Sequence, residues 1–184
     1  MKITDHFDSD EFTCHDGISY PLDNAEDGSG IPTGWTVPAG SPNTWQFSRL
    51  LPLCLMNEVI RQAAIEKYGL SEEDAGLIID SGYRDEEYDE KIYNAHVEAY
   101  GDDGLVAKAS TSIHPKGGAN DLRHKKLTPL QLYTLILELY EAGKLPYIGG
   151  VGKYPSFVHV DGRPRSAKGQ HLAMWGGVRP SNIA

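Results

Sequence analysis

The chain has 184 residues, enough to bury a hydrophobic core without disulfides or a metal as its main support. Its formal net charge of −9 argues against nucleic acid and anionic membranes, because both partners require clustered Lys and Arg. No stretch reaches the roughly 18 apolar residues of a membrane-spanning helix, and 40% hydrophobic with 23% charged residues is typical of a globular protein. We expect one domain over residues 1–184, a monomer that neither binds nucleic acid nor inserts into a membrane.

The N-terminal sequence MKITDHFDSDEF contains neither the apolar segment nor the small-residue cleavage site of a signal peptide. The two cysteines, Cys14 and Cys54, are too few for a disulfide framework and have no CxxC spacing. Free thiols are expected, although a single bridge between them stays open. Residues 20–46 are rich in Gly, Pro, Asn, Asp and Ser, a composition that predicts a long surface loop or insertion.

Three segments have the apolar periodicity and end signals of helices. The first covers about residues 47–68 and is predicted to be buried. The second follows Asp85, a suitable N-cap, and stops at Gly101. The third begins after Thr128, a second N-cap, and is terminated by Gly143. The second and third helices are therefore each predicted to begin after a capping residue and to end at a glycine.

Short β-rich runs predict strands. An apolar run at 75–83 is consistent with a buried strand, and residues 118–122 are predicted to run as a strand after a glycine turn. Residues 147–151 and 157–161 are separated by Gly and Pro, so neighbouring strands are expected there. With helices early in the chain and strands late, the expected class is α+β.

The segment S-T-S-I-H-P-K-G-G-A-N-D (110–121) sets His114 and Asp121 seven positions apart. Two ligands of one metal ion must approach within a few ångströms, so the chain between them has to reverse direction. Gly117 and Gly118 permit such a turn. The strand that follows can then present Asp121 to the same site as His114.

The segment G-G-V-G-K-Y-P-S-F-V-H-V-D carries the third candidate ligand, His159. Side chains alternate along a strand, so Phe157, His159 and Asp161 share one face while Val158 and Val160 share the other. The valines are expected to fill the core. The face with His159 is expected to look into a cleft.

Two imidazoles and one carboxylate would leave a fourth zinc position open for water, the pattern of a catalytic site. Zinc in such a site lowers the pKa of bound water to about 7 and polarises a scissile carbonyl. A lone His in a strand is, however, often a hydrogen-bonded structural residue, and a His and an Asp seven apart also occur by chance. The remaining histidines form no comparable constellation and are predicted to be surface or structural residues: His6, His15, His96, His124 and His171.

Together these motifs resemble the zinc D-alanyl-D-alanine carboxypeptidase family, which includes L-alanyl-D-glutamate endopeptidases and phage lysins. The family pattern S-x-H-x-x-G-x-A-x-D corresponds to residues 112–121, and the family's SGYR segment corresponds to residues 81–84. The GGVG-Y-P-x-F-V-H-V-D segment, followed by Arg163 or Arg165 and by Trp175, is similar to the branch ending in GFVHxD…RxW. The opening HFDSDEFTCHDG is also like the start of that branch.

The resemblance implies a fold shared with the hedgehog signalling domain, in which helices pack on a small, mostly antiparallel sheet. It implies one zinc ion held by His114, Asp121 and His159. By position, Arg84 and Ser112 would bind the substrate, Arg84 by bidentate hydrogen bonds to carboxylates of a peptide. The other interpretation of Arg84 is an ion pair with the acidic helix that follows it.

The chain departs from the family pattern at one position. Many members have Glu or Asp three residues before the last zinc histidine, as the general base; Ser156 stands there in this chain. Asp161, two residues beyond His159, is the nearest replacement as the catalytic base. Its alternative role is to orient a metal ligand from behind.

The function expected from this resemblance is a zinc metallopeptidase that hydrolyses amide bonds in peptidoglycan stem peptides, as a D,D-carboxypeptidase or an L-alanyl-D-glutamate-type endopeptidase. It would act on the bacterial cell wall, in the periplasm, outside the cell or delivered by a phage. The rival hypothesis is a catalytically inactive zinc-containing module of the same fold, which binds its partner or belongs to a virion. Ser156 is the feature that supports the rival.

Overall fold

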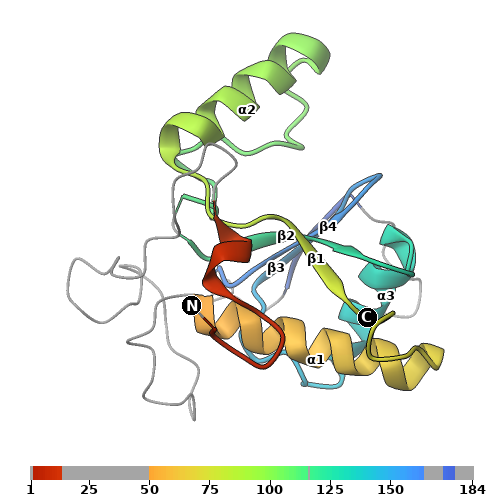
Figure 1. Cartoon of the computed structure of the whole chain (residues 1–184). Helices are drawn as coiled ribbons and strands as arrows, with labels where there is room; N and C mark the ends of the chain where they lie inside the picture. The colour runs from red at the N-terminus through yellow and green to blue at the C-terminus, as the bar shows by residue number, and fades with distance from the viewer. Residues whose placement is uncertain (1, 14–49, 116, 164–171, 177–184) are drawn as a thin grey trace.

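A mixed five-stranded sheet forms the centre of the structure, a computed structural model that describes residues 2–13, 50–115, 117–163 and 172–176 (Figure 1). The strand order is β1-β2-β4-β3-β5. The strands are β1 (Leu77–Ser81), β2 (Ala119–His124), β3 (Gly150–Lys153), β4 (Val158–Asp161) and β5 (Ala173–Trp175). The pairings β1–β2, β2–β4 and β3–β4 are antiparallel, and β3–β5 is parallel. The expected α+β class is confirmed.

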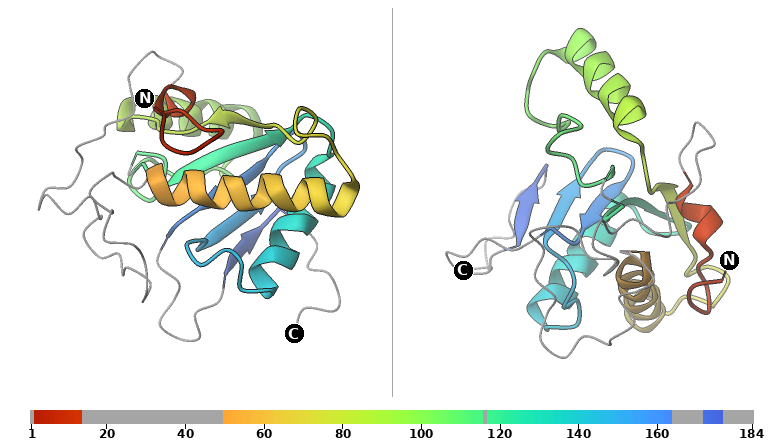
Figure 2. Two further views of the ribbon diagram at one scale, coloured as in Figure 1. Left: turned by 60° about the horizontal axis from the view of Figure 1, so that its bottom comes forward. Right: turned by 90° about the vertical axis from the view of Figure 1, so that its left-hand side faces the viewer.

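Two helices, α1 (Leu50–Tyr68) and α3 (Pro129–Glu141), cover one side of the sheet, as both views in Figure 2 show. The third helix, α2 (Glu86–Tyr100), projects on the other side, away from the sheet. None of the described helices is long and apolar enough to cross a membrane. The sheet therefore has one face committed to the core and one face left for a site.

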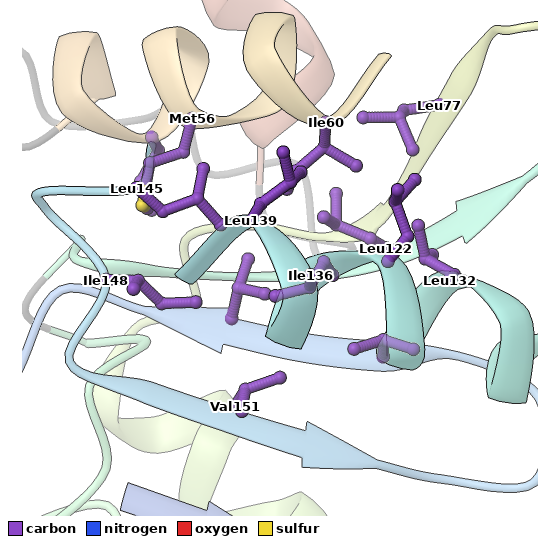
Figure 3. Packing of buried hydrophobic residues seen from close by; sticks show 14 of the residues in the cluster. Met56, Ile60, Leu77, Leu122, Leu132, Ile136, Leu139, Leu145, Ile148 and Val151 are labelled. Carbon is purple, nitrogen blue, oxygen red and sulfur yellow. The ribbon is translucent and has the colours of Figure 1, made fainter. Parts of the chain in front are cut away.

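The core lies between the sheet and the helices α1 and α3. Met56 and Ile60 from α1 meet Ile136 and Leu139 from α3, and Val151 packs beneath them from the sheet (Figure 3). The predicted inward-facing valines Val158 and Val160 are both fully buried in this cluster. Burial of this apolar surface is the main source of stability for the layered arrangement.

The predicted helix ends are confirmed. The Asp85 side chain caps α2 by accepting a hydrogen bond from the backbone N–H of Tyr88 at 2.7 Å, and Gly101 ends that helix with φ 83°. Thr128 caps α3 in a reciprocal capping box with Gln131. Gly143, with φ 69°, lies one residue beyond the C-cap of α3.

Other expectations need correction. The strands predicted at 75–83 and 118–122 are confirmed as β1 and β2. Because both lie between helices in the chain, the expected order of early helices and late strands holds only in part. The strand predicted at 147–151 begins only at Gly150, because Pro146 and Tyr147 form a turn. The three-residue strand β5 and a short 3-10 helix, Ser9–Phe12, were not predicted because neither is long enough to show periodicity.

The predicted loop at 20–46 and Cys14 lie outside the described residues. Cys54 is described, and it is a buried free thiol in α1, as expected.

Truncating Ile136, which is 0% exposed in α3, should leave a cavity between that helix and the sheet. We expect Ile136→Ala to lower the free energy of unfolding by roughly 2–5 kcal/mol, measured by urea denaturation. Leu130→Ala on the same helix is the matched control, because Leu130 is 61% exposed and its truncation should change stability by no more than about 0.5 kcal/mol. Equal losses in the two variants would contradict this account of the core.

Candidate metal centre

The register of the sheet brings two of the three predicted ligands together. Asp121 in β2 and His159 in β4 are direct partners in the antiparallel ladder, so their side chains leave the same face of the sheet. That face is opposite the one occupied by Val158 and Val160, because side chains alternate along a strand. The prediction that His159 lies on the face opposite Val158 and Val160 is therefore confirmed by the observed pairing.

The third predicted ligand, His114, comes from the loop that leads into β2. The chain reverses there: the N–H of Gly117 donates to the carbonyl oxygen of His114 at 2.9 Å, and the N–H of Gly118 donates to that of Ile113 at 3.2 Å. Gly117 has φ 67°, in the left-handed region that favours glycine. This glycine turn folds His114 back over the strand that carries Asp121.

The three side chains form one buried cluster that could hold a metal ion. His159 Nδ1 lies 2.9 Å from Asp121 Oδ1 and 3.2 Å from His114 Nε2, and one ligand atom from each residue lies within 4.8 Å of the others. The residues are 4%, 5% and 7% exposed for His114, Asp121 and His159. Buried polar groups this close are costly unless they share protons or a cation.

Each histidine is oriented by a second hydrogen bond on its far ring nitrogen. His114 Nδ1 donates to the carbonyl oxygen of Gly82 at 2.6 Å, and His159 Nε2 donates to Asp161 Oδ2 at 3.0 Å. Because a carbonyl or carboxylate oxygen can only accept, these contacts fix where the protons lie. His114 Nε2 and His159 Nδ1 are therefore the nitrogens available to the cluster, an arrangement typical of metal-binding histidines.

The electrostatics favour an anionic Asp121 between two imidazoles. Burial alone would raise the pKa of Asp121, but His114 and His159 outweigh it and hold this pKa well below its usual range. Burial lowers the pKa of His114. Burial also opposes protonation of His159, but hydrogen bonds to Asp121 and Asp161 outweigh it and raise the pKa of His159 to about 9. A proton and a metal ion would therefore compete for His159 Nδ1.

Arg84 lies against the cluster and is already engaged by protein groups. Its Nη2 donates to Asp121 Oδ2 at 2.6 Å and to His114 Nε2 at 2.7 Å. Its Nη1 donates to Asp89 Oδ1 at 3.1 Å, and its Nε donates to the Ser81 hydroxyl at 2.9 Å. The predicted ion pair of Arg84 with the helix that follows it is present. Arg84 also lines a pocket, as its predicted role in substrate binding requires.

The other predicted substrate-binding residue, Ser112, is buried at the pocket wall and its hydroxyl accepts a hydrogen bond from the backbone N–H of His114 at 3.3 Å. It thus contributes to the turn that presents His114.

Asp161 lies behind His159 rather than in the pocket. It is 0% exposed, and besides His159 it accepts hydrogen bonds from the backbone and guanidinium of Arg163 at 2.6–2.9 Å. A Cβ at Gly150 would come within 2.6 Å of Asp161 Oδ2, so the glycine leaves room for this ion pair. The placement favours the orienting role over proton transfer. Ser156 is exposed in the turn between β3 and β4 and does not line the pocket.

The cluster opens on a pocket of about 550 Å³ between the sheet and α2. Its polar lining includes Arg84, Asp89, Ser112 and the three cluster residues. Its apolar lining includes residues from α2 and the loop after it, namely Ile92, Leu105, Val106 and Ala107. Its aromatic lining consists of Tyr154, Phe157 and Trp175.

Sequence reasoning missed Asp89 and Tyr154 as pocket residues. Asp89 lies five residues after Arg84, within the acidic first turn that indicated only a helix start. Tyr154 stands within a recognised segment, but its hydroxyl contacts become apparent only in three dimensions.

The remaining described histidines lie outside the cluster, as expected. His6 pairs with Glu58, His96 with Asp103, and His124 accepts backbone hydrogen bonds at the end of β2. His15 and His171 fall outside the described residues.

Compared with known protein families, curated proteins and solved structures, the chain matched none of them.

Removing the charge behind His159 should weaken metal binding. We expect Asp161→Asn to lower zinc affinity roughly 10-fold to 100-fold, measured by competition with a chromophoric chelator, because the ring loses its orienting anion. Asp103→Asn is the matched control: Asp103 bonds His96 at 2.8 Å in the same way, outside the cluster. If both variants bind zinc like the wild type, Asp161 has no orienting role.

Proposed function

We propose that the chain is a zinc-dependent peptidase that hydrolyses amide bonds in peptidoglycan stem peptides. The observation that carries the proposal is the convergence of His114, Asp121 and His159 at the wall of an open pocket. Two imidazole nitrogens and one carboxylate are a donor set suited to zinc, and no described cysteine or methionine adjoins them. When bound in such a site, zinc acts as a Lewis acid on a carbonyl and makes water a nucleophile at neutral pH.

The supports of the two rings suit that ion, but the guanidinium of Arg84, which donates to His114 Nε2 and Asp121 Oδ2, would have to withdraw for the ion to bind. The carbonyl of Gly82 and the carboxylate of Asp161 hold the two rings with their free nitrogens toward Asp121. The cluster is walled off on the core side by the sheet and open on the other side to the pocket.

The pocket also suits a peptide that carries carboxylates. Arg84 and Arg163 line it and supply positive charge on either side of the cluster. Arg84 is balanced by Asp89 and Asp121, and its planar group orients these acids as well as any carbonyl that enters. The zinc D-alanyl-D-alanine carboxypeptidase family, which the motifs of this chain resemble, acts on stem peptides. On that resemblance we propose the same class of substrate for this chain.

A second candidate function is a zinc-containing binding module, such as a virion component, without turnover. Two observations favour it: Ser156 is exposed outside the pocket, and Asp161 is sequestered by His159 and Arg163. Neither residue is placed to accept a proton from a substrate. This candidate predicts bound zinc and muropeptide affinity with no released product.

Digestion of purified sacculi and defined muropeptides, read by mass spectrometry, tests the proposal. We expect the zinc-loaded protein to release one specific fragment, and a chelator or His114→Ala to reduce release at least about 100-fold, since each removes the site's charge stabilisation. His96→Ala, which lies outside the cluster, should leave the rate unchanged.

Zinc content measured on the same samples separates the two candidates. Stoichiometric zinc without product, together with muropeptide binding, would replace the peptidase by the binding module. Absence of both zinc and product would overturn both candidates.

A further inference from the structure

The segment from Glu86 to Ile113, here called the arm, comprises α2 and the loop that returns to His114. Its helix α2 projects away from the rest of the structure in Figure 1 and in the right view of Figure 2. Asp89 is the one buried residue of α2. An element with so little burial of its own depends on specific contacts to keep its position.

The first half of the returning loop is fastened to α2 by side-chain hydrogen bonds. The hydroxyl of Tyr93 donates to Asp102 at 3.2 Å, and Asp103 pairs with His96 at 2.8 Å. Asp103 also accepts from the backbone N–H of Leu105 at 2.9 Å. These bonds fold the loop on the helix but do not connect it to the sheet.

The ion pair of Asp89 with Arg84 holds the start of α2, and the returning loop is connected to the sheet by Tyr154, which directly follows β3. Its hydroxyl donates to the carbonyl oxygen of Leu105 at 2.8 Å and accepts from the indole N–H of Trp175 at 2.9 Å. Its ring stacks on Phe157 with 4.4 Å between centroids. The ring of Trp175 in turn lies 5.2 Å from that of His159. The backbone of Leu105 is thus linked, through the hydroxyl of Tyr154, to Trp175, whose ring packs on His159.

Leu105 is an exposed apolar residue at the pocket. It is 44% exposed, yet its side chain lines the pocket with Ile92 and Val106. The other large exposed hydrophobic residues among those described do not line it: Ile78, Tyr100 and Leu130. An exposed leucine that lines the same pocket as a group of convergent polar side chains is typical of ligand recognition.

We propose that the arm is the specificity wall of the site, that Leu105 contacts a small aliphatic side chain of the peptide substrate, and that Tyr154 is the positioning residue that holds Leu105. This inference rests on the proposed function. In a stem peptide the small aliphatic side chains are the methyl groups of alanine. The polar lining would face the backbone of the same residue.

A comparison of two substrates tests Leu105: a stem pentapeptide and its analogue with glycine in place of each alanine. We expect the wild type to show a KM about 4-fold lower for the alanine peptide, since Leu105 contacts one methyl group and burial of a methyl group contributes roughly a factor of four. Leu105→Ala should reduce this ratio to about 2. Leu130→Ala, equally an exposed leucine, should keep the wild-type ratio. An unchanged ratio in Leu105→Ala would overturn the wall.

A second variant tests Tyr154 without removing its ring. Tyr154→Phe deletes the two hydrogen bonds of the hydroxyl and keeps the stacking on Phe157. We expect amide hydrogen exchange at 101–107 to become at least about 10-fold faster, KM for the alanine peptide to rise about 2-fold to 4-fold, and zinc content to stay unchanged. Tyr93→Phe is the matched control, because its hydroxyl bonds within the arm alone. Unchanged exchange in Tyr154→Phe, or an equal rise in KM in Tyr93→Phe, would overturn the positioning role.

These measurements fail separately from the proposed function. If the wild type releases no product, KM is replaced by the Kd of each peptide, and the same ratios decide on the wall. If the wild type turns over and neither variant changes the ratio or the exchange, the peptidase stands and the specificity wall does not.

Discussion

The pairing of β2 with β4 sets Asp121 opposite His159, and the candidate site depends on this register. If either strand slipped by one residue, its own candidate ligand would turn to the core face, and the two side chains would no longer meet. The register is held by the same residues that build the core, because Leu122, Val158 and Val160 are all fully buried beneath α1 and α3. Packing on one face of the sheet thus fixes polar geometry on the other.

Burying two histidines and an aspartate in this way is unfavourable unless each polar atom is matched. The structure meets this requirement with a second layer of groups: the carbonyl of Gly82 behind His114, and Asp161 behind His159. Asp161 is itself neutralised by Arg163. Arg163 is only partly buried, so this series of paired charges ends near solvent. The cluster is therefore preorganised by its supporting groups and not by its own contacts alone.

The sequence predicted those parts of the site that depend on local rules. Alternation along a strand placed His159 on the face opposite Val160, and a glycine turn was the evident means of bringing His114 toward Asp121. Helix caps at Asp85 and Thr128 followed from side-chain chemistry. The parallel strand β5 was not predictable, because its three residues are stabilised by pairing with β3, a contact between segments distant in the chain. The same reason hid the contact of Tyr154 with Leu105, which joins residues 49 positions apart.

Holding a metal ion and turning over a substrate place separate demands on this fold. The first needs convergent donors with firm supports, and His114, Asp121 and His159 have these on the sheet side of the pocket. The second also needs a group that can move a proton and a wall that aligns the peptide. Asp161 is committed to His159, so it strengthens the first property at the expense of the second. The wall belongs to the arm, which is joined to the sheet by contacts such as those of Tyr154 and Arg84. Under the proposed function, changes in the arm would alter substrate choice while the three candidate ligands and their core support stay the same, so one sheet could serve either a hydrolase or a binding module.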